Sequence, residues 1–554
     1  MPFSFKHPYT FPAAYSLPVA YFCMEYAIAQ PLKTYAGGLG FLAGSHLRSA
    51  FELKQNMVAI GILWKYGYYD QVRKSDQTMD VLFQEKVYGF LQPTEIKFTI
   101  RVSGHDVWVT AFYLPPEVFG TAPLFLLSTD IPENDYLSKT ISHQLYDFNP
   151  ETTIAAAILL GIGGARLLEC LAWQPEVYHL NESHALPLAF FLYNRYKSTE
   201  ELKKRLVFTN HTPEAGGNPR SNVFLLEKMG FFGNTPLAEV RKMIKDNGDQ
   251  LDQTLAALRL SGLANAVSVK HKETLSGIWA PFPDICPLLS ITNAQNYTYW
   301  SDKKMYAAMM ANDDEALLTQ KKQAKEILFG KIADENGEIY DKDVLTIVFA
   351  KRFTGFKRPD LLLHDMQRFH RLVTNRERPI QIVWAGKPYP MDYASIGVFD
   401  KIVNISKQYP NCSTLTGYEL RLSKLLKGGA DLWLNTPRLT HEASGTSGMT
   451  AAMNGAVNAS LPDGWFPEFA NDRINCFLIP PCDPSLPEHS QDEADAASLY
   501  DLLENDILPM YYEYPDRWLS IMKNSMSDII THFGSNRLAD EYYRKLYSRK
   551  VMEM

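Results

Sequence analysis

The chain has 554 residues, which is too many for one ordinary hydrophobic core and predicts two large domains. Hydrophobic residues make up 46% and charged residues 21% of the chain, as in soluble globular proteins. The net charge of −7 argues against nucleic acid as a partner, and six scattered cysteines without a CxxC pair argue against a disulfide framework or a zinc site.

The N-terminal stretch MPFSFKHPYTFPAAY has no charged segment followed by an apolar one, so no signal peptide is predicted. The most apolar run begins at Ile154 and reaches Arg166 after about one dozen residues, fewer than a helix needs to cross a bilayer. We therefore expect a cytoplasmic protein without a membrane partner.

The first half of the chain alternates apolar strands with helices. Its clearest helix is ETTIAAAILLGIGGARLLECLA, residues 151–172. The predicted strands are residues 19–26, 57–64, 107–114, 124–129, 177–181 and 206–210.

The second half alternates in the same way. Strands are predicted at 344–350, 380–386 and 431–435, and helices at 359–373, where Pro359 opens the helix, at 420–429 and at 447–456. A helix at 313–333 leads into this half, and the tail from about residue 498 is helical. Alternation of this kind predicts the α/β class, with parallel doubly wound sheets. The expected domains are 1–300, 301–510, and 511–554 as helices that pack back on the first domain.

Polar clusters follow several of these strands: TNHTP, KRFTGFKRP, GKPYP and NTPRLTHEASGTSG. In open α/β sheets, ligands bind outside the carboxyl ends of the strands. Two such sheets facing each other would place the clusters around one cleft, which is where we expect the active site.

Three clusters have more than one interpretation. Gly38, Gly40 and Gly44 form a loose GxGxxxG loop that suits a phosphate, but a tight turn with close helix packing explains it equally well. The run AKRFTGFKRPD, with Lys351, Arg352, Lys357 and Arg358, is either a solvated basic loop or an anion site, and we favour the anion site because a helix is predicted to follow.

The stretch HEASGTSGM combines Glu442 with small residues whose backbone amides a ligand can approach, although a helix N-cap is the alternative. His184 and His211 lie just past predicted strands, where a histidine is either catalytic or part of the core. Neither histidine has metal-ligand spacing, so no metal is predicted.

The assembled motifs resemble the α-glucan (glycogen and maltodextrin) phosphorylase family in its short bacterial form, from Val19 to about Tyr547. The segments that carry the resemblance are AYFCMEYAIAQPLKTYAGGLGFLAGSHLRSA, GILWKYGYYDQ, STDIPEND, VYHLNESHA, VFTNHTPEA, KRFTGFKRPDLL, VWAGKPYP, GADLWLNTPRLTHEASGTSGM and MNGAVNASLPDGW. The resemblance implies two Rossmann-like domains, the GT-B class of retaining glycosyltransferases.

The resemblance also implies roles for individual residues. The catalytic set it implies is His211, Arg352, Lys357 and Glu442, of which Arg352 and Lys357 hold the substrate phosphate. The substrate-binding set is Gly38, Leu39, His184, Asn293, Ala443, Ser444 and Gly445. Lys351, Thr446 and Ser447 match contacts to the phosphate of pyridoxal 5′-phosphate (PLP). An α-glucan or maltooligosaccharide and phosphate or a sugar phosphate are the expected partners, and the resemblance leaves a homodimer open.

One departure concerns the cofactor. Family members have a lysine where this chain has Thr450, and that lysine forms the Schiff base with PLP. Thr450 has no amine, so we expect PLP not to be covalently bound here, or no cofactor at all. A second departure is TNAQN at residues 292–296, where the family usually has TNGV.

Three functions remain open from the sequence. The first is an α-glucan phosphorylase, which has the sugar and phosphate residues but not the lysine. The second is a PLP-independent glycosyltransferase that uses a nucleotide sugar, which explains Thr450 but has no recognisable nucleoside-binding signature. The third is a non-catalytic glucan-binding or regulatory homologue. Mass spectrometry of small molecules bound to the native protein separates them.

Overall fold

The structure, a computed structural model, describes residues 3–213 and 218–548. Its contacts divide the chain into two compact units. The first unit comprises Met1–Tyr68, Phe83–Asn293 and Ser535–Met554, and the second comprises Tyr69–Leu82 and Ala294–Gly534. The chain therefore passes from one unit to the other four times.

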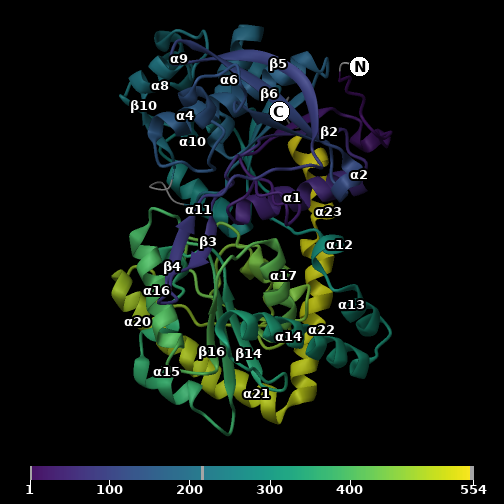
Figure 1. Ribbon diagram of the computed structural model, residues 1–554, viewed down its shortest axis with the longest axis vertical. Helices are drawn as coiled ribbons and strands as arrows, with labels where there is room; N and C mark the ends of the chain where they lie inside the picture. Colours follow the sequence, from purple (N-terminus) through teal and green to yellow (C-terminus); the bar gives the residue numbers. More distant parts are fainter. Residues whose placement is uncertain (1–2, 214–217, 549–554) are drawn as a thin grey trace. The chain divides into compact units, whose positions relative to one another are not determined.

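The first unit contains a nine-stranded sheet in its described residues (Figure 1). Seven strands run parallel, and β5 and β6 add an antiparallel edge beyond β7. The order is β13 (Leu288–Ser290), β12 (Leu263–Ala266), β9 (Leu206–Thr209), β8 (Val177–Asn181), β1 (Val19–Phe22), β2 (Met57–Ile62), β7 (Leu124–Ser128), β6 (His105–Leu114) and β5 (Gln92–Val102).

Helices connect these strands, and η2, α5, α7, α10 and α11 contact the sheet. They are α1 (Gly38–Glu52), α2 (Pro116–Phe119), α3 (Tyr136–Thr140), α4 (Pro150–Ile158), η2 (Leu159–Gly163), α5 (Gly164–Cys170), η3 (Ser183–Ala185), α6 (Pro187–Tyr196), α7 (Thr199–Lys203), α8 (Val223–Met229), α9 (Leu237–Ile244), α10 (Gln253–Leu260) and α11 (Val269–Trp279). The C-terminal α23 (Ser535–Glu541) and η8 (Tyr542–Leu546) also belong to this unit, as does the small ribbon β10 (Arg220–Asn222) with β11 (Gln250–Asp252).

The second unit is built on a six-stranded sheet in which every pair is parallel. The order is β16 (Cys412–Leu415), β15 (Ile380–Ala385), β14 (Leu345–Ala350), β17 (Leu432–Asn435), β18 (Val457–Ser460) and β19 (Cys476–Leu478). In chain order this is 3-2-1-4-5-6, the arrangement of a dinucleotide-binding Rossmann sheet. Every residue of β14 and β15 is buried, as expected for strands covered on both faces.

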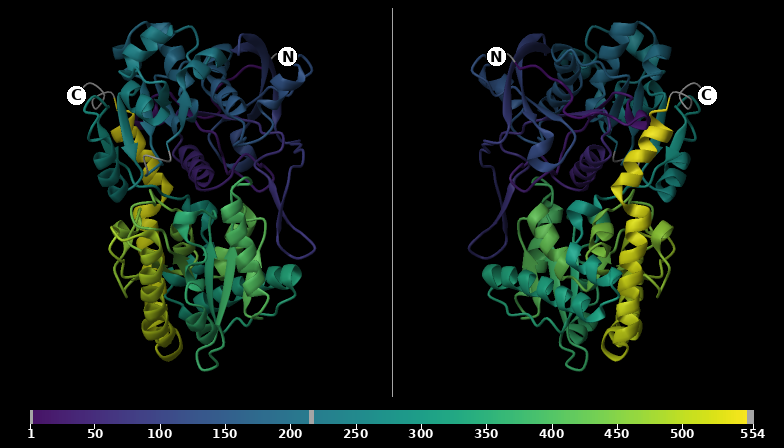
Figure 2. Two further views of the ribbon diagram at one scale, coloured as in Figure 1. Left: turned by 90° about the vertical axis from the view of Figure 1, so that its left-hand side faces the viewer. Right: turned by 90° about the vertical axis from the view of Figure 1, so that its right-hand side faces the viewer.

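The helices of the second unit flank this sheet. They are α12 (Tyr297–Trp300), α13 (Lys303–Met310), α14 (Asp314–Asn336), η5 (Gly355–Lys357), η6 (Leu361–Leu363), α15 (Met366–Val373), α16 (Tyr393–Ser406), α17 (Leu420–Gly429), α18 (Ser447–Ala452), α19 (Phe466–Phe469), α20 (Glu488–Leu502), η7 (Leu503–Ile507), α21 (Leu508–Glu513) and α22 (Pro515–Phe533). The long yellow helix in Figure 2 is α22, which packs against α18, β18 and β19.

A hairpin from the first half of the sequence belongs to the second unit. It consists of β3 (Asp70–Arg73) and β4 (Met79–Leu82). Arg73 donates to Glu335 Oε1 at 3.2 Å, and Gln71 Nε2 donates to the Gly386 carbonyl at 3.0 Å. The contact units therefore differ from the expected domain ranges here, and also at 294–300 and 511–534, which group with the second unit.

The α/β class with two doubly wound units is confirmed, and so are the predicted strands. The helix predicted to open at Pro359 is wrong. The Asp365 carboxylate accepts the backbone N–H groups of Gln367 and Arg368, so α15 begins only at Met366. Since no α-helix starts at Pro359, a helix dipole cannot support the anion site there.

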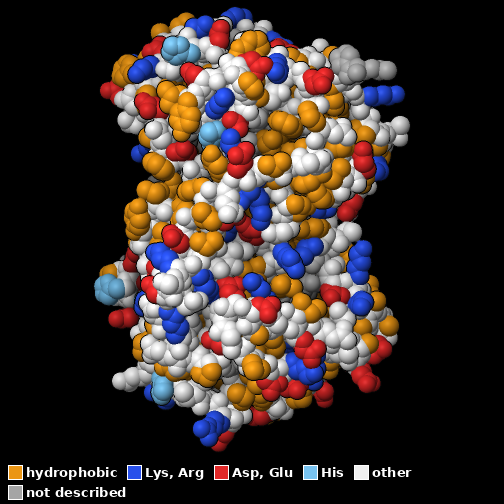
Figure 3. Space-filling model, in the orientation of Figure 1, with side chains coloured by type: hydrophobic (Ala, Val, Ile, Leu, Met, Phe, Trp, Pro, Cys, Tyr) orange, Lys and Arg blue, Asp and Glu red, His pale blue; other side chains and the backbone are white. Residues whose placement is uncertain are grey.

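Among the described residues, one helical stretch, Pro150–Cys170, is long and apolar enough to cross a membrane. Of its most apolar window, 78% is buried within the protein, as in the core helix of a globular unit. The apolar run counted from Ile154 to Arg166 was shorter than this stretch, because α4, η2 and α5 join without a break. On the face drawn in Figure 3, acidic and basic side chains are interspersed in each unit.

A buried ion pair fixes α14 to the second sheet. Lys325 Nζ lies 2.5 Å from Asp431 Oδ2, with 1% and 6% of the two side chains exposed. Asp431 Oδ2 also accepts the Thr346 N–H at 2.9 Å, so one carboxylate joins the helix to the starts of β14 and β17. A buried carboxylate that loses its cation is left with an uncompensated charge.

We expect Lys325→Met to lower the free energy of unfolding by about 3–5 kcal/mol, because Asp431 stays buried without its partner. Urea unfolding at neutral pH measures this. Lys322→Met on the same helix is the matched control, since Lys322 pairs with Asp343 at a site where 49% and 61% of the side chains are exposed. Equal losses in the two variants would contradict the structural role of the buried pair.

Candidate functional site

The second unit has its switch point at β14 and β17. These strands are neighbours, and the strand order reverses there, so the chain leaves their carboxyl ends in opposite directions. Lys351 directly follows β14, and Asn435 is the last residue of β17. The predicted cation run and the predicted Glu442 segment therefore start at adjacent strand ends.

Lys351 lies buried at the carboxyl end of β14. Its buried Nζ donates to Asn435 Oδ1 at 2.5 Å. Burial, and after it the charge of Lys357, lower the pKa of Lys351 to about 7. An anion bound beside Lys351 would favour the protonated ammonium group and raise that pKa. The charge of Lys351 would therefore depend on whether an anion is bound.

Lys357 and Glu442 form an ion pair at the same place. Lys357 Nζ donates to Glu442 Oε2, with 12% and 15% of the side chains exposed. Burial raises the pKa of the Glu442 carboxyl, but the charge and hydrogen bond of Lys357, with Lys351 and Arg352 beyond it, hold the pKa below its usual range. Glu442 is therefore an anion surrounded by three cations.

Arg352 and Arg358 have different surroundings. Arg352 is exposed and has no ion-pair partner among the described residues. Arg358 is 3% exposed, donates to the Thr436 and Pro437 carbonyls, and pairs with Asp495 at 2.7 Å. The predicted cluster of four cations thus contains three that face the site, because Arg358 is occupied in holding the loop after β17.

Asp463 positions Glu442, and the sequence reading missed it. Its Oδ2 accepts the Glu442 N–H at 2.9 Å, and its Oδ1 accepts the Gly464 N–H at 2.9 Å. Burial raises the pKa of Asp463 to about 6. The only signal in the sequence was the turn-like LPDGW, which gives no hint that the carboxylate faces Glu442.

The segment after Glu442 is tightly packed. A Cβ on Gly445 would lie 3.1 Å from Glu442 Cδ, and one on Gly448 would lie 2.6 Å from Asn458 Oδ1. Thr446 makes no capping hydrogen bond with its side chain, so the N-cap alternative is wrong for this residue. Ser444 Oγ is buried without a hydrogen-bond partner in the part of the chain that the structure describes, and Ala443 is buried beside it. An unpaired buried hydroxyl suits a ligand hydroxyl.

Position 450 does not fit a covalent cofactor. Thr450 is 1% exposed, and its hydroxyl donates to the Ser447 carbonyl at 3.0 Å within α18. A threonine side chain offers no amine. The nearby Lys351 suits the phosphate of PLP in charge, but the residue at position 450 cannot anchor the ring.

The first unit has its own switch point, at β1 and β8. Glu25 follows β1, and its carboxylate accepts the N–H groups of Ala36 and Gly37 and the Tyr146 hydroxyl at 2.7, 3.0 and 2.5 Å. Glu182 follows β8 with φ +70°, a conformation that costs energy for a residue with a Cβ. The sequence reading passed over both carboxylates.

Glu182 holds the chain at His211. Its Oε1 accepts the His211 N–H at 2.5 Å and the Thr212 hydroxyl at 3.2 Å. The His211 ring contacts Asn181 Oδ1 through Nε2 at 2.7 Å. Desolvation, with His271 and His184 nearby, lowers the pKa of His211 to about 3, so the ring is neutral. The predicted motif extends to Glu214 and Ala215, which lie outside the described residues.

His184 and Asn293 each have a buried polar atom that makes no hydrogen bond within the described residues. Burial lowers the pKa of His184 to about 4, and its Nδ1 has no partner among the described residues. Asn293 is 3% exposed, and in the same described part of the chain its Oδ1 also has no partner. A sugar hydroxyl could satisfy such atoms, because it both donates and accepts.

The glycine-rich loop divides into two kinds of position. A Cβ on Gly40 would lie 2.6 Å from Tyr35 Cβ, and one on Gly44 would lie 2.1 Å from the Ala27 carbonyl oxygen, so close packing explains these two. Gly38 is exposed with nothing within 4 Å of a built Cβ, and Leu39 beside it is half-buried. Close packing therefore does not explain Gly38 and Leu39, the two loop residues predicted to bind substrate.

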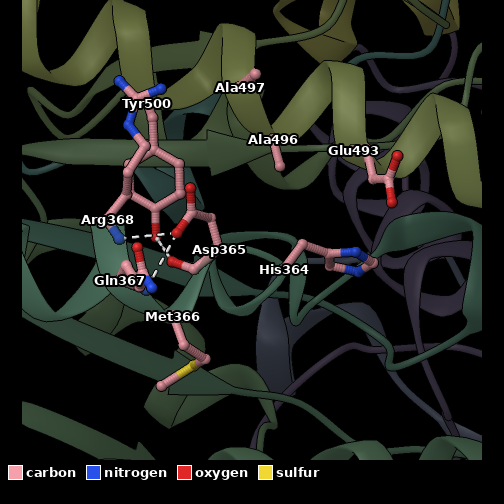
Figure 4. Close-up of a pocket in the computed structure, with 9 residues that line it drawn as sticks. All are labelled: His364, Asp365, Met366, Gln367, Arg368, Glu493, Ala496, Ala497 and Tyr500. Atoms are coloured by element: carbon pink, nitrogen blue, oxygen red, sulfur yellow. Dashed lines mark hydrogen bonds between the residues drawn. The ribbon is translucent and has the colours of Figure 1, made fainter.

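A separate hollow of about 320 Å³ lies in the second unit, lined by residues of α15 and α20 (Figure 4). Its polar groups bond to protein: the Tyr500 hydroxyl donates to the Leu362 carbonyl at 2.5 Å, and Arg368 pairs with Glu504 at 2.6 Å. None of the predicted site residues lines it, so it is not the candidate site.

Comparisons with known proteins agree with this architecture. The family model Carbohydrate phosphorylase matches residues 293–472. An uncharacterized protein of Methanocaldococcus jannaschii is 45% identical, over 95% of this chain and 99% of its own length. Maltodextrin phosphorylase of Thermococcus litoralis is 34% identical, over 96% of this chain and 71% of its own length. Glycogen phosphorylase of Aquifex aeolicus is 29% identical, over 97% of this chain and 87% of its own length.

Two doubly wound α/β units, each with polar side chains at its switch point, fit the two-domain fold of the GT-B type. The chain belongs to the carbohydrate phosphorylase family.

Asp463 should make stability depend on pH. Its pKa of about 6 in the folded protein lies above the value near 4 of an unfolded chain, so the folded state binds more protons and stability falls as pH rises from about 4 to 6. We expect the advantage of the wild type over Asp463→Asn to shrink by about 3 kcal/mol between pH 4 and pH 7. Urea unfolding of both proteins measures it. A pH-independent difference would contradict the assignment.

Proposed function

We propose that the protein catalyses the phosphorolysis of α-1,4-glucans, in which a glucan and phosphate give α-glucose 1-phosphate with retention of configuration. The observation that carries the proposal is the group of Arg352, Lys357 and Lys351 around Glu442 at the β14–β17 switch point. Relatives named maltodextrin phosphorylase and glycogen phosphorylase support it.

The second unit would bind the phosphate and the transferred glucosyl unit. Arg352 is exposed and offers two parallel N–H groups, so it is suited to meet the phosphate first. Lys357 is bound to Glu442 in the free protein, so a phosphate would compete with that carboxylate for the ammonium. Glu442, Ser444 and Gly445 would then turn toward sugar hydroxyls.

The first unit would bind glucose hydroxyls through neutral groups. His211 and His184 have pKa values of about 3 and 4, so both rings are uncharged at neutral pH and can donate from one nitrogen and accept at the other. Asn293 offers its buried Oδ1. Neutral donors and acceptors suit a glucan, which has no charge of its own.

In the proposed reaction, an oxygen of hydrogen phosphate bonds to the anomeric carbon and the bond from that carbon to the glycosidic oxygen breaks. The proton of the hydrogen phosphate passes to this oxygen as it leaves. The clustered cations would stabilise the phosphate as the bond changes. PLP, when bound, supplies a second phosphate group, which Lys351, Thr446 and Ser447 are expected to contact. Thr450 has no amine, so we expect no Schiff base between position 450 and PLP.

Thr450 favours a second candidate, a transferase that uses a nucleoside-diphosphate sugar and needs no PLP. The distal phosphate of such a donor would contact the same Arg352 and Lys357. Binding of glucose 1-phosphate against binding of a nucleoside-diphosphate glucose separates the two candidates. The cytoplasmic location and a homodimer remain predictions.

Arg352→Ala should weaken the binding of phosphate and glucose 1-phosphate by about tenfold to hundredfold, because a hydrogen bond to a charged group contributes about 1.5–3 kcal/mol. Isothermal calorimetry at fixed salt measures it. Arg376→Ala, an exposed arginine outside the site, is the matched control and should bind as the wild type does. Unchanged affinity in Arg352→Ala would reject the phosphate site.

Glu442→Ala should weaken the binding of maltopentaose sharply, at least tenfold, because a site built around sugar hydroxyls discriminates strongly when a partner is missing. The same substitution frees Lys357, so inorganic phosphate should bind at least as tightly as in the wild type. Calorimetry with each ligand separately checks both directions. If maltopentaose binds equally well to both proteins, glucan recognition lies elsewhere.

A further inference from the structure

The six-stranded sheet of the second unit has the strand order of a dinucleotide-binding sheet. In such a sheet the phosphates lie at the switch point, and a carboxylate that follows the second strand of the first βαβ unit binds the ribose. The corresponding strands here are β14 and β15, with β16 beyond them. A nucleoside would therefore lie at the carboxyl ends of β15 and β16, which we call the nucleoside half of the sheet.

The residues after β15 do not supply a carboxylate for a ribose. Gly386 and Lys387 follow this strand. A Cβ on Gly386 would lie 2.1 Å from the Lys351 carbonyl oxygen, so a longer side chain does not fit there. Lys387 Nζ pairs with Glu419 at 2.8 Å and donates to the Tyr69 carbonyl at 2.9 Å. A glycine and a bonded ammonium group thus stand where a nucleotide-binding sheet has its acidic residue.

The hairpin of β3 and β4 is bonded to both strand ends of the nucleoside half. Gln71 is 6% exposed, its Nε2 donates to the Gly386 carbonyl at 3.0 Å, and its Oε1 accepts the Gly417 N–H at 3.0 Å. Arg73 donates from Nη2 to the Thr414 carbonyl. Gly386 directly follows β15, Thr414 lies in β16, and Gly417 comes two residues after that strand. Side chains of the hairpin therefore bond to the backbone at the ends of both strands.

The side-chain amide of Gln71 has the hydrogen-bonding pattern of a nucleobase edge. An amide presents a donor beside an acceptor, as adenine does with its N6 amino group and N7. Here the donor contacts the carbonyl of Gly386 and the acceptor contacts the N–H of Gly417. These two backbone groups, which a base could otherwise contact, are therefore already bonded within the chain.

Further contacts hold the hairpin in the second unit. The Tyr69 hydroxyl, directly before β3, donates to the Pro388 carbonyl at 2.8 Å. Arg73 Nε donates to Glu335 Oε1 at 3.2 Å, and the same oxygen accepts the Thr416 N–H at 2.7 Å. Strand β4 contacts α16, as the two labels in Figure 1 allow the reader to follow. Both strands of the hairpin are thus fixed to the unit.

The cations of the proposed phosphate site, Lys351, Arg352 and Lys357, follow β14, whereas the hairpin bonds to the ends of β15 and β16. We propose that the β3–β4 hairpin fills the nucleoside half of this sheet and so selects substrates that bring phosphate without a nucleoside. Inorganic phosphate and glucose 1-phosphate need no group in the nucleoside half, but a nucleoside-diphosphate sugar does. This inference rests on the proposed function for the reaction, and it disfavours the nucleotide-sugar donor.

The test measures what a nucleoside adds to binding. Inorganic pyrophosphate carries the two phosphates of ADP, GDP and UDP without a nucleoside. The dissociation constant of pyrophosphate divided by that of each nucleotide, from calorimetry at fixed salt, is the nucleoside ratio. We expect a ratio near one for the wild type, because the base and ribose find no partner. A ratio of about ten or more with any of the three nucleotides would overturn the proposal.

A shortened hairpin uncovers the strand ends. Asp70 and Leu82 are paired across the hairpin, so residues 71–81 can be replaced by two glycines without separating the flanking chain. We expect the nucleoside ratio to rise at least about tenfold for one or more nucleotides, with the affinity for pyrophosphate unchanged. Circular dichroism melts check that the variant folds. A folded variant that keeps the wild-type ratio would refute the proposal.

A point variant decides the question should the shortened chain not fold. Gln71→Ala keeps the hairpin but releases the Gly386 carbonyl and the Gly417 N–H, so we expect the nucleoside ratio to rise at least about threefold. Gln77→Asn is the matched control, because Gln77 is exposed in the turn of the same hairpin, with a φ of +72° that asparagine tolerates. This control should keep the wild-type ratio. The same ratio in Gln71→Ala and in the wild type would contradict the proposal.

The proposed function is read separately, by calorimetry of maltopentaose and inorganic phosphate with the wild type. Phosphate binding without maltopentaose binding would reject the proposed function, and a raised nucleoside ratio in the two hairpin variants would still support the role of the hairpin. Binding of both ligands together with unchanged ratios in the variants would reject the hairpin and leave the proposed function.

Discussion

The ion pair of Lys357 and Glu442 is the interaction on which the second unit's site depends. The two residues come from loops that follow β14 and β17, and these loops meet because the strand order reverses there. Each charge is largely withdrawn from water, so neither is stable there without the other. Asp463 holds Glu442 through the backbone, and Arg358 holds the loop after β17. A ligand that binds here must exchange one charged partner for another.

The two switch points have opposite electrostatic characters. In the second unit an anion is surrounded by cations, and the pKa of Lys351 is lowered to about 7 by burial among them. In the first unit the rings of His211 and His184 are neutral, and their unpaired or amide-bonded nitrogens suit hydroxyls. The proposed function therefore assigns phosphate binding and sugar-hydroxyl binding to two different sheets, each at its switch point.

Long apolar runs could be assigned from sequence because burial on both faces leaves little choice of residue, as in β14 and β15. Short sequence signals predicted helix starts and the roles of single residues less well. Pro359 suggested a helix start, but the Asp365 carboxylate caps α15 six residues later. The roles of Asp463 and Glu182 depend on partners 21 and 29 residues away, so no local pattern could identify them. Lys351, Lys357 and Glu442 were found because their residue types follow strand ends, and the resemblance named the same positions.

Both units are discontinuous in sequence, and this has a consequence for synthesis on the ribosome. The first unit includes η8 and, directly after it, Tyr547, whose hydroxyl lies 2.8 Å from Nδ1 of His179 in β8. That contact cannot form until Tyr547 has left the exit tunnel. The hairpin of β3 and β4, made early, must wait for Glu335 before it has a surface to pack on. The first unit therefore stays incomplete until its C-terminal segment has been made, a period in which chaperones would cover its apolar faces.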